Sequence, residues 1–419
     1  MKKSKFNFCY KRDNNENIIY NTFSKAIILL DDEEYSQYEG QEIQNENIKK
    51  ELLENGIYVE DDFNEMDFLK YFHYKTKFSN ETLYLTIAPT LDCNFACPYC
   101  YENRRKGKMT QEIQDAIVDF VEDAISKGTK KLDISWYGGE PLLYPDIVES
   151  LSRRINDLAQ RSGCTVSMHM VTNGYLLTEP IVEMLDEVGV SRIQITLDGL
   201  KNYHDVRRPL RNGAGTFDKI IENLKLFADF PIEVLIRMNV DNQNQKDFMA
   251  LKSMIDSLDN PNMKVYTSPV EDINKDTIND VSDFMTTEEF DAFTVKTCED
   301  GGQSKEDFSV MDDRFCFCTA ETENCYVIDD VGDVYKCWDE VGRIEHRCFN
   351  ILTPDTTNYT VIAKYLTYDP FDNEKCRDCV YLPLCFGGCK FQRTNLNKSV
   401  CGFNKEMLKA YLESAYFSD

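Results

Sequence analysis

The sequence predicts an α/β protein whose main domain is a parallel sheet curved into a partial, TIM-like (β/α)6 barrel. From Leu83 onward, six short apolar runs alternate with segments in which apolar residues recur at helical spacing. The runs are followed by Gly, Pro or Asn, residues that typically end strands. They are LYLTIAP, KLDISWYGG, TVSMHMVTNG, SRIQITLDG, IEVLIRMNV and MKVYTSP. In such folds the chemistry lies on the loops that follow the strands.

The chain of 419 residues is long enough for two or three domains. Three short strands (KFNFCY, NIIYNTF, KAIILL) and two helical segments in residues 1–80 predict a small winged-helix module. A structural cap on the main domain is the alternative. The barrel is expected over 81–270, an acidic bridging segment with one helix over 271–315, and a cysteine-rich domain with a final helix over 316–419.

The composition excludes several classes of partner. With 47 basic and 73 acidic residues the formal charge is -26, so the surface repels phosphate backbones and anionic lipid. No apolar stretch reaches the length of a membrane helix, and the basic N-terminus lacks a signal-peptide core, so we expect a cytoplasmic protein. In that reducing compartment, 16 cysteines indicate metal or cluster ligation instead of disulfides.

Three cysteines follow the first predicted strand directly. Cys93, Cys97 and Cys100 have the spacing Cys-x3-Cys-x2-Cys, which a short loop can wrap around one iron–sulfur cluster. A [4Fe-4S] cluster needs four ligands, so three thiols leave one iron free to bind another molecule. A zinc loop is the alternative, but it needs a fourth ligand and no histidine is near in the sequence.

Polar residues and glycines follow the later strands, on the edge of the sheet where Cys93 is expected. Glycines allow backbone carbonyls to approach a ligand, and a carboxylate there can accept from an ammonium group. An arginine at a strand end is more often part of a structural ion pair. The candidate ligand-binding residues are Gly138, Gly139, Glu140, Thr172, Asn173, Thr196, Asp198 and Arg237.

The cysteine spacing, with the aromatic Tyr99 before the last cysteine, resembles the radical S-adenosylmethionine (SAM) enzymes. The resemblance implies that Cys93, Cys97 and Cys100 hold a catalytic [4Fe-4S] cluster and that SAM binds its open iron. It also implies contacts of the 138–140 segment with the SAM amino group, of the 196–199 segment with the ribose, and of Arg237 with the carboxylate. The segment His204-Asp205-Val-Arg207-Arg208 resembles these enzymes too, without an assigned role.

The C-terminal cysteines form a second set. The segment CYVIDDVGDVYKCW predicts a hairpin turning at Gly332. The order of seven cysteines resembles the SPASM extension of radical SAM peptide-modifying enzymes, which carries two auxiliary [4Fe-4S] clusters. The resemblance assigns auxiliary cluster I to Cys318, Cys337 and Cys389, and auxiliary cluster II to Cys376, Cys379, Cys385 and Cys401.

This assignment makes three [4Fe-4S] clusters in all. The fourth ligand of cluster I is Cys316, Cys325 or absent. Paired zinc knuckles are the alternative for the whole region.

One departure from the family pattern bears on function. Sulfatase maturases carry an aspartate directly after the hairpin cysteine, whereas here Trp338 holds that place and Asp339 follows. This favours a radical SAM oxidoreductase that forms thioethers in ribosomally made peptides, of the sactipeptide or ranthipeptide type. The implied partners are a precursor peptide, whose leader would bind residues 1–80, and a reductant such as flavodoxin or ferredoxin.

Other functions stay open at this point. They are a carbon–carbon cross-linking maturase, an anaerobic sulfatase (formylglycine) maturase, and a non-enzymatic iron–sulfur or zinc protein.

Overall fold

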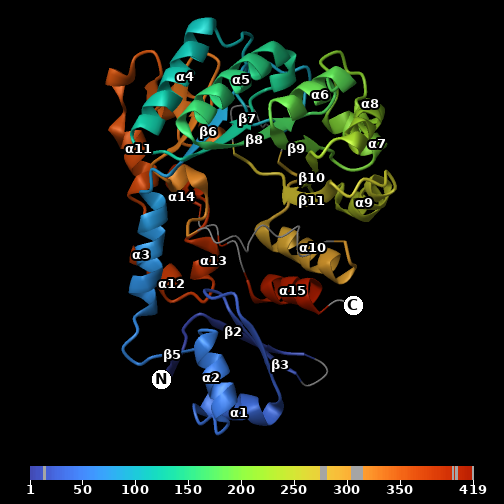
Figure 1. Ribbon diagram of the computed structural model, residues 1–419. Helices are drawn as coiled ribbons and strands as arrows, with labels where there is room; N and C mark the ends of the chain where they lie inside the picture. Colours follow the sequence, from blue (N-terminus) through green and yellow to red (C-terminus); the bar gives the residue numbers. More distant parts are fainter. Residues whose placement is uncertain (13–15, 274–280, 303–314, 399–400, 402–403, 418–419) are drawn as a thin grey trace. The chain divides into compact units, whose positions relative to one another are not determined.

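The computed structural model describes residues 1–12, 16–273, 281–302, 315–398, 401 and 404–417 (Figure 1). Contacts divide the chain into two units. The barrel unit comprises Ser79–Asp307 and Glu323–Leu366, and the second unit combines Met1–Phe78, Phe308–Thr322 and Thr367–Asp419. We call the second one the three-segment unit.

The barrel unit contains the predicted parallel sheet. Its strand order is β11-β10-β9-β8-β7-β6-β12-β13-β14, and the six strands from β6 to β11 are parallel, which confirms the predicted fold class. Each of the six apolar runs contains one of these strands. They are β6 (Thr82–Ile87), β7 (Lys131–Trp136), β8 (Thr165–Thr172), β9 (Val190–Thr196), β10 (Glu233–Val240) and β11 (Met263–Pro269).

Helices cover one face of this sheet. In β6 burial alternates along the strand, with Leu83, Leu85 and Ile87 in the core beside α4 residues such as Ile117. Helix α4 carries apolar residues at helical spacing and begins at a Thr110 side-chain cap. The helices of the unit are α4 (Gln111–Ser126), α5 (Pro145–Ser162), α6 (Glu179–Glu187), α7 (Lys201–Arg207), α8 (Phe217–Leu224), α9 (Phe248–Asp256), α10 (Thr287–Glu299) and α11 (Tyr359–Leu366).

The predicted hairpin extends the barrel sheet. Strands β12 (Cys325–Ile328) and β13 (Asp333–Tyr335) are antiparallel and turn at Gly332, whose φ of 82° favours glycine. Strand β12 pairs in parallel with β6, and β14 (Phe349–Asn350) pairs with β13. The sequence predicted a separate C-terminal domain over 316–419, whereas residues Glu323–Leu366 belong to the barrel unit. The reason is that β12 pairs with β6 and satisfies backbone groups that would otherwise lie at a sheet edge.

The three-segment unit is built around a small antiparallel sheet, β2 (Asn7–Lys11), β3 (Asn17–Asn21) and β4 (Ile27–Leu30). These are the three strands expected near the N-terminus. Helices α1 (Asp32–Gly40) and α2 (Glu46–Glu54) contribute to the core that includes Ile19 and Ile28.

The C-terminal helix α15 (Lys405–Tyr416) packs against Ile18 and Tyr20 of the same sheet through residues such as Leu412. Residues 1–80 therefore share a core with the end of the chain.

Helix α3 (Glu65–Lys77) is the long element among the rest of this unit, and it was not predicted. The sequence pattern that could have indicated this helix is the Asn64 cap followed by Leu69 and His73, which are four residues apart and both buried. The remaining elements are β1 (Lys2–Lys3), β5 (Tyr58–Val59), α12 (Glu374–Arg377), α13 (Leu382–Cys385) and α14 (Lys390–Asn395).

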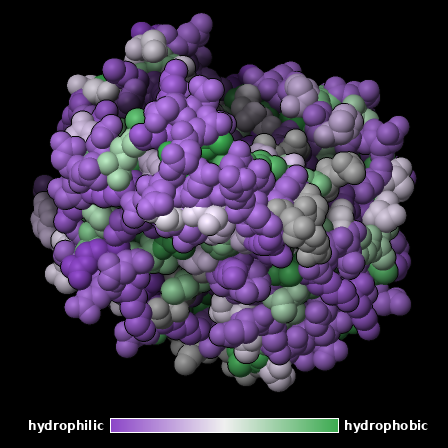
Figure 2. Space-filling view, turned by 90° about the horizontal axis from the view of Figure 1, so that it is seen from below, coloured by the Kyte–Doolittle hydropathy of each residue, from purple (hydrophilic) through white to green (hydrophobic). Residues whose placement is uncertain are grey.

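Figure 2 shows one face of the molecule coloured by hydropathy. In the view from below, hydrophilic residues dominate and apolar ones are scattered (Figure 2). Among the described residues, no helix has the length and apolar character needed to cross a membrane.

Candidate active site

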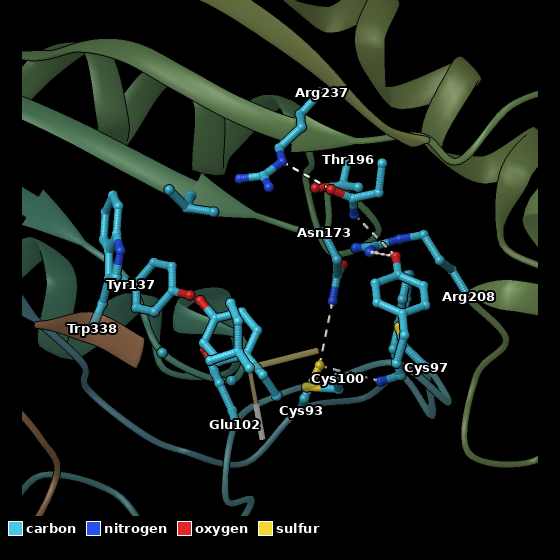
Figure 3. Close-up of a pocket in the computed structure, with 18 of the residues that line it drawn as sticks. Cys93, Cys97, Cys100, Glu102, Tyr137, Asn173, Thr196, Arg208, Arg237 and Trp338 are labelled. Carbon is cyan, nitrogen blue, oxygen red and sulfur yellow. Dashed lines mark hydrogen bonds between the residues drawn. The ribbon is translucent and has the colours of Figure 1, made fainter. Parts of the chain in front are cut away.

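A pocket of about 280 Å³ in the barrel unit brings the predicted site residues together (Figure 3). It is lined by the loop that carries Cys93, Cys97 and Cys100, which we call the cluster loop, and by residues at or just after the ends of successive strands. Of the candidates from the sequence, it includes Cys93, Cys97, Cys100, Gly138, Gly139, Thr172, Asn173, Thr196 and Arg237. Glu140 and Asp198 lie behind these residues, fully buried.

The three cysteines are held on a loop that the chain itself orders. The backbone N–H groups of Ala96 and Arg211 donate to carbonyls of the facing segment, Pro209 and Asn94 respectively. The guanidinium of Arg104 donates through Nη1 to the Phe95 carbonyl (2.7 Å) and through Nη2 to the Cys97 carbonyl (3.5 Å). These hydrogen bonds hold the loop in a defined shape.

The thiols are in a setting that suits metal ligation. Burial, followed by repulsion from Glu140, raises the pKa of Cys93 to about 12, and burial also raises the pKa of Cys97. A raised pKa favours the neutral thiol, so these sulfurs would bind as thiolates only beside a metal cation that stabilises the negative charge. In the described part of the chain, no three His, Cys, Asp or Glu side chains lie close enough together to hold a single metal ion.

Gly138 and Gly139 allow the end of β7 to lie against the segment that leads into the cluster loop. A Cβ on Gly138 would lie 2.5 Å from the Thr90 carbonyl oxygen, and one on Gly139 would lie 2.2 Å from the Asp92 carbonyl oxygen. Both contacts are impossible without moving backbone. The glycines are therefore required for this close approach, whatever they do for a ligand.

Glu140 has a different place from the one expected. Its carboxylate accepts from the Leu142 N–H (3.0 Å), the Asn173 N–H (2.8 Å) and the Thr172 hydroxyl (2.7 Å). The side chain does not line the pocket. It ties the end of β7 to the end of β8, so its contribution to a ligand is the positioning of Thr172 and Asn173.

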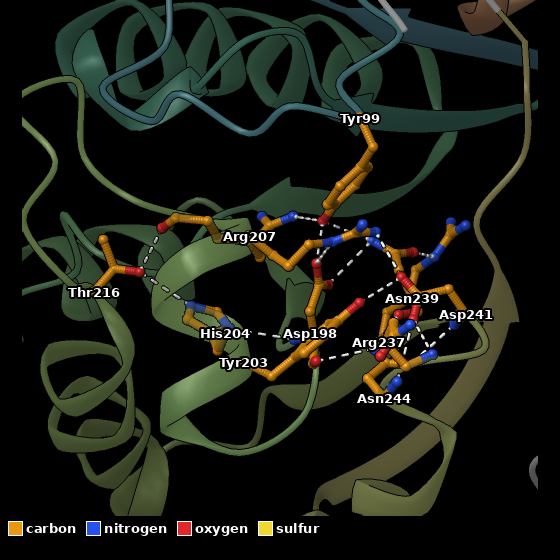
Figure 4. Close-up of polar contacts among 12 residues, drawn as sticks. Tyr99, Asp198, Tyr203, His204, Arg207, Thr216, Arg237, Asn239, Asp241 and Asn244 are labelled. Carbon is orange, nitrogen blue, oxygen red and sulfur yellow. Dashed lines mark hydrogen bonds and ion pairs between the residues drawn. The ribbon is translucent and has the colours of Figure 1, made fainter. Parts of the chain in front are cut away.

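Asp198 likewise acts through a neighbour. Its Oδ2 accepts from the hydroxyl of Tyr99 (2.5 Å), and that hydroxyl in turn accepts from Nη1 of Arg208 (2.7 Å) (Figure 4). The guanidinium of Arg207 lies 4.4 Å from the centroid of the Tyr99 ring. Tyr99 thereby fastens the cluster loop to the end of β9.

The segment 204–208 orders the same region. The Asp198 N–H donates to Nδ1 of His204 (3.2 Å), so the Nε2–H donates to the Thr216 hydroxyl (3.0 Å). Burial lowers the pKa of His204 well below its ordinary value. This histidine is therefore neutral, and its segment positions both Asp198 and, through Arg208, Tyr99.

Arg237 keeps its charge available. Its Nε donates to Asn239 (2.8 Å) and its Nη2 to Ser268 (2.9 Å), both neutral groups. The alternative to a role in binding was a structural ion pair, and among the described residues Arg237 makes none. A ligand carboxylate would find an oriented guanidinium here.

The pocket residues that were not predicted as site residues include Glu102, Tyr137, Trp338 and Asp339. Burial raises the pKa of Glu102 to about 7, and burial followed by repulsion from Glu271 raises the pKa of Asp339 to about 6. Only Asp339 had a signal in the sequence, as the carboxylate next to Trp338. The structure shows that it reaches the pocket despite the shift by one residue.

The proposed ligands of auxiliary cluster II lie together in the three-segment unit. Burial raises the pKa of Cys385 to about 11, with further contributions from the nearby thiols of Cys379, Cys376 and Cys401. These cysteines span 26 positions of sequence, from 376 to 401. Cys376, Cys379 and Cys401, which the family resemblance groups with Cys385, therefore lie within electrostatic range of its thiol.

A buried ion pair joins the two chain segments that carry Cys318 and Cys389, two of the proposed ligands of auxiliary cluster I. Lys390, next to Cys389, lies 3.1 Å from the carboxylate of Glu321, and the two side chains are 1% and 0% exposed. The same carboxylate accepts from the Cys318 N–H (3.2 Å). The third ligand, Cys337, belongs to the barrel unit.

The candidate fourth ligands of cluster I lie in different units, Cys316 in the three-segment unit and Cys325 at the start of β12.

Comparison with known proteins assigns the class. Residues 87–255 match the model of the radical SAM superfamily, so the chain contains a radical SAM domain over this range. This match supports SAM and an iron–sulfur cluster as cofactors.

The matching relatives and structures include a sulfatase-maturating enzyme and two complexes with peptides. The chain is 26% identical to a cysteine-type anaerobic sulfatase-maturating enzyme of Clostridium novyi (strain NT), over 74% of this chain and 88% of the relative. Native anSMEcpe with bound AdoMet and Cp18Cys peptide aligns with a TM-score of 0.63 at 21% identity, covering 80% of this chain and 97% of that one.

Streptococcus suis SuiB bound to precursor peptide SuiA aligns with a TM-score of 0.53 at 17% identity, covering 93% of this chain and 95% of that one. These structural likenesses establish the shared fold.

Proposed function

We propose that this chain is a peptide maturase that joins a cysteine sulfur to a carbon of another residue in a ribosomally made precursor. The pocket that unites the cluster loop with the strand ends carries this proposal. When bound, the cluster supplies the electron that cleaves SAM into methionine and a 5′-deoxyadenosyl radical, which removes a hydrogen atom from carbon. The chain's own task is to bind, orient and keep out water.

The residues divide this task among themselves. Cys93, Cys97 and Cys100 would hold the cluster, and Arg237 would orient SAM through its carboxylate. Thr172, Asn173 and Thr196 would offer polar contacts from the ends of β8 and β9. Glu140 and Asp198 are positioning residues, because each is buried and acts on a pocket residue.

The similar proteins favour a peptide substrate. The names of the relative and of the two structures describe a sulfatase-maturating enzyme and complexes with a Cys-containing peptide and a precursor peptide. Residues 1–80 remain our candidate for binding a leader peptide. Since they share a core with α15, deleting them would expose the apolar face of that helix, so point substitutions are the better test.

We also propose that three [4Fe-4S] clusters are present. The presence of Cys376, Cys379 and Cys401 within electrostatic range of Cys385 supports the second auxiliary cluster. The ion pair between the Cys318 and Cys389 segments supports the first.

The test begins with composition and SAM cleavage. Anaerobically reconstituted protein should hold about twelve iron ions, and the Cys93→Ala/Cys97→Ala/Cys100→Ala variant should lose about four of them. Reduced wild-type protein should form 5′-deoxyadenosine and the variant should not. Equal product from both proteins would refute the radical chemistry.

The cross-link itself is decided with the precursor from a neighbouring reading frame. A thioether removes two hydrogens and consumes one thiol, whereas a carbon–carbon bond removes two hydrogens and leaves all thiols free to alkylate.

A second candidate is a sulfatase maturase, which the position of Asp339 favours. The sequence argument against it was the replacement of an aspartate by Trp338, yet Asp339 places a carboxylate in the same pocket. Conversion of a sulfatase-derived cysteine peptide to the formylglycine form, observed by mass spectrometry, would establish this candidate in place of the thioether.

A further inference from the structure

One wall of the pocket has a chemistry that neither the cluster nor the SAM contacts explain. Resting on the proposed peptide substrate, we propose that this wall is a subsite for a cationic side chain of that substrate, an ammonium or guanidinium group. It is formed by two carboxylates and two aromatic rings, those of Glu102, Asp339, Tyr137 and Trp338.

Glu102 is the central residue of this subsite. Its side chain lines the pocket, the residue is 8% exposed, and its Oε2 is buried without a hydrogen-bond partner. Burial without a hydrogen-bond partner is unfavourable for a carboxylate oxygen. The neighbouring cation, Arg104, directs two of its donors to backbone carbonyls of the cluster loop. The Oε2 atom of Glu102 therefore remains available to a donor from outside the chain.

The rings beside Glu102 have the matching property. Trp338 is 44% exposed, and its ring lies 5.3 Å from that of Tyr137 at 32°. The faces of such rings attract cations. Figure 3 shows Glu102, Tyr137 and Trp338 on one side of the pocket, with Thr196 and Arg208 on the other.

The wall is also electronegative. Asp339 lies within electrostatic range of both Glu102 and Glu271, which also lines the pocket. Of the pocket arginines, Arg208 donates to Tyr99. Arg104 and Arg237 lie within electrostatic range of Glu102 and Asp339 respectively, and each directs donors to neutral groups. An acidic side chain would be repelled from this wall, and a neutral apolar one would leave Glu102 unpaired. A cation satisfies both carboxylates and both rings.

The ammonium group of SAM has the same chemistry, so the experiment separates the two sources. The probes are Nα-acetyl-L-lysine methylamide and its norleucine counterpart, which differs by the loss of the charge. Their dissociation constants are measured by ligand-observed NMR on the reconstituted, SAM-loaded full chain. The affinity for SAM is measured separately by equilibrium dialysis.

We expect the lysine probe to bind about tenfold more tightly than the norleucine probe. Glu102→Gln keeps the shape of the side chain and should abolish that preference while the affinity for SAM is unchanged. Trp338→Leu should weaken the lysine probe by a smaller factor. Glu112→Gln, at an exposed position of α4, is the matched control and should change neither affinity.

Two results would overturn the subsite. One is equal affinity for the two probes in the wild-type protein. The other is a Glu102→Gln protein that loses affinity for SAM and keeps the lysine preference, since the cation would then be that of SAM. Failure of the proposed function is recognised independently, by the absence of 5′-deoxyadenosine.

Discussion

The two units of this protein bring their cysteines together in different ways. In the barrel unit, Cys93, Cys97 and Cys100 lie on one loop, and consecutive β/α repeats deliver the other pocket residues to the same edge of the sheet. In the three-segment unit, Cys318 and Cys389 come from distant segments, which the buried pair of Glu321 and Lys390 joins. A site on consecutive repeats depends on local order, whereas a site between distant segments depends on the contacts that join them.

The largest effect is expected from breaking the ion pair that joins the Cys318 and Cys389 segments. Lys390→Met leaves the Glu321 carboxylate buried and unpaired, which should cost about 3–5 kcal/mol of unfolding free energy. The reconstituted variant should also lose iron. Denaturant unfolding and iron analysis measure the two effects.

The barrel unit supplies the control for this substitution. Lys201 and Asp218 form an exposed pair, so Lys201→Met should leave the free energy of unfolding almost unchanged. The double variant Lys390→Met/Glu321→Gln should recover part of the lost stability. If Lys390→Met proved as stable as Lys201→Met, the ion pair would not be what joins the two cysteine segments.

The next effect concerns the dependence of the N-terminal sheet on the C-terminal helix. Leu412→Ala removes a fully buried side chain of α15 and should destabilise the three-segment unit by about 2–5 kcal/mol. Hydrogen exchange followed by mass spectrometry should show faster exchange in β3 and unchanged exchange in β8. Lys405→Ala, exposed on the same helix, is the control. Unchanged exchange in β3 would mean that residues 1–80 fold independently.

In the barrel unit, the hydroxyl of Tyr99 joins the cluster loop to the end of β9. Tyr99→Phe leaves Arg208 and Asp198 without the group that joins them, which should cost about 1–3 kcal/mol. Exchange should increase at residues 94–104, and the affinity for SAM should fall. Tyr203→Phe removes a hydroxyl that donates to Asp241 instead, and should leave the cluster loop unchanged. A loop equally affected by both variants would argue against a specific role of Tyr99.

The smallest effect compares the two units under acid. Each has a buried histidine, His73 in the three-segment unit and His204 in the barrel, and burial lowers both pKa values. The unfolded chain therefore binds more protons than the folded one below about pH 6.5, and stability is lost as the pH falls. The free energy of unfolding should fall by about 1.4 kcal/mol per pH unit for each histidine at the steepest part of this pH range.

Hydrogen exchange between pH 7 and pH 5 measures this loss separately in α3 and β9. His204→Asn keeps an acceptor for the Asp198 N–H and should flatten the acid loss in β9 alone. His169→Gln, at a half-exposed position of β8, is the control and should leave the slope unchanged. A wild-type barrel unit insensitive to acid would show that His204 is not held neutral.

Much of the barrel could be predicted from the sequence, because its signals are local. Each parallel strand is a short apolar run, and the hairpin turn is marked by Gly332. Helix α7 was missed, since its few residues between Lys201 and Arg207 show no long apolar period. The pairing of β12 with β6 was missed as well, because nothing in either strand indicates which edge it will meet.

The sequence by itself determined the barrel strands and the three-cysteine loop, because spacing within a few residues decides which groups a loop or strand end presents. It also placed Gly138, Thr172, Thr196 and Arg237 at one edge, since parallel strands end together. Only the tertiary structure decided that Glu140 turns into the core and that Asp339 reaches the pocket. It alone joined α15 to the N-terminal sheet. These outcomes depend on packing and buried charge between distant segments, which leave no local pattern in a sequence.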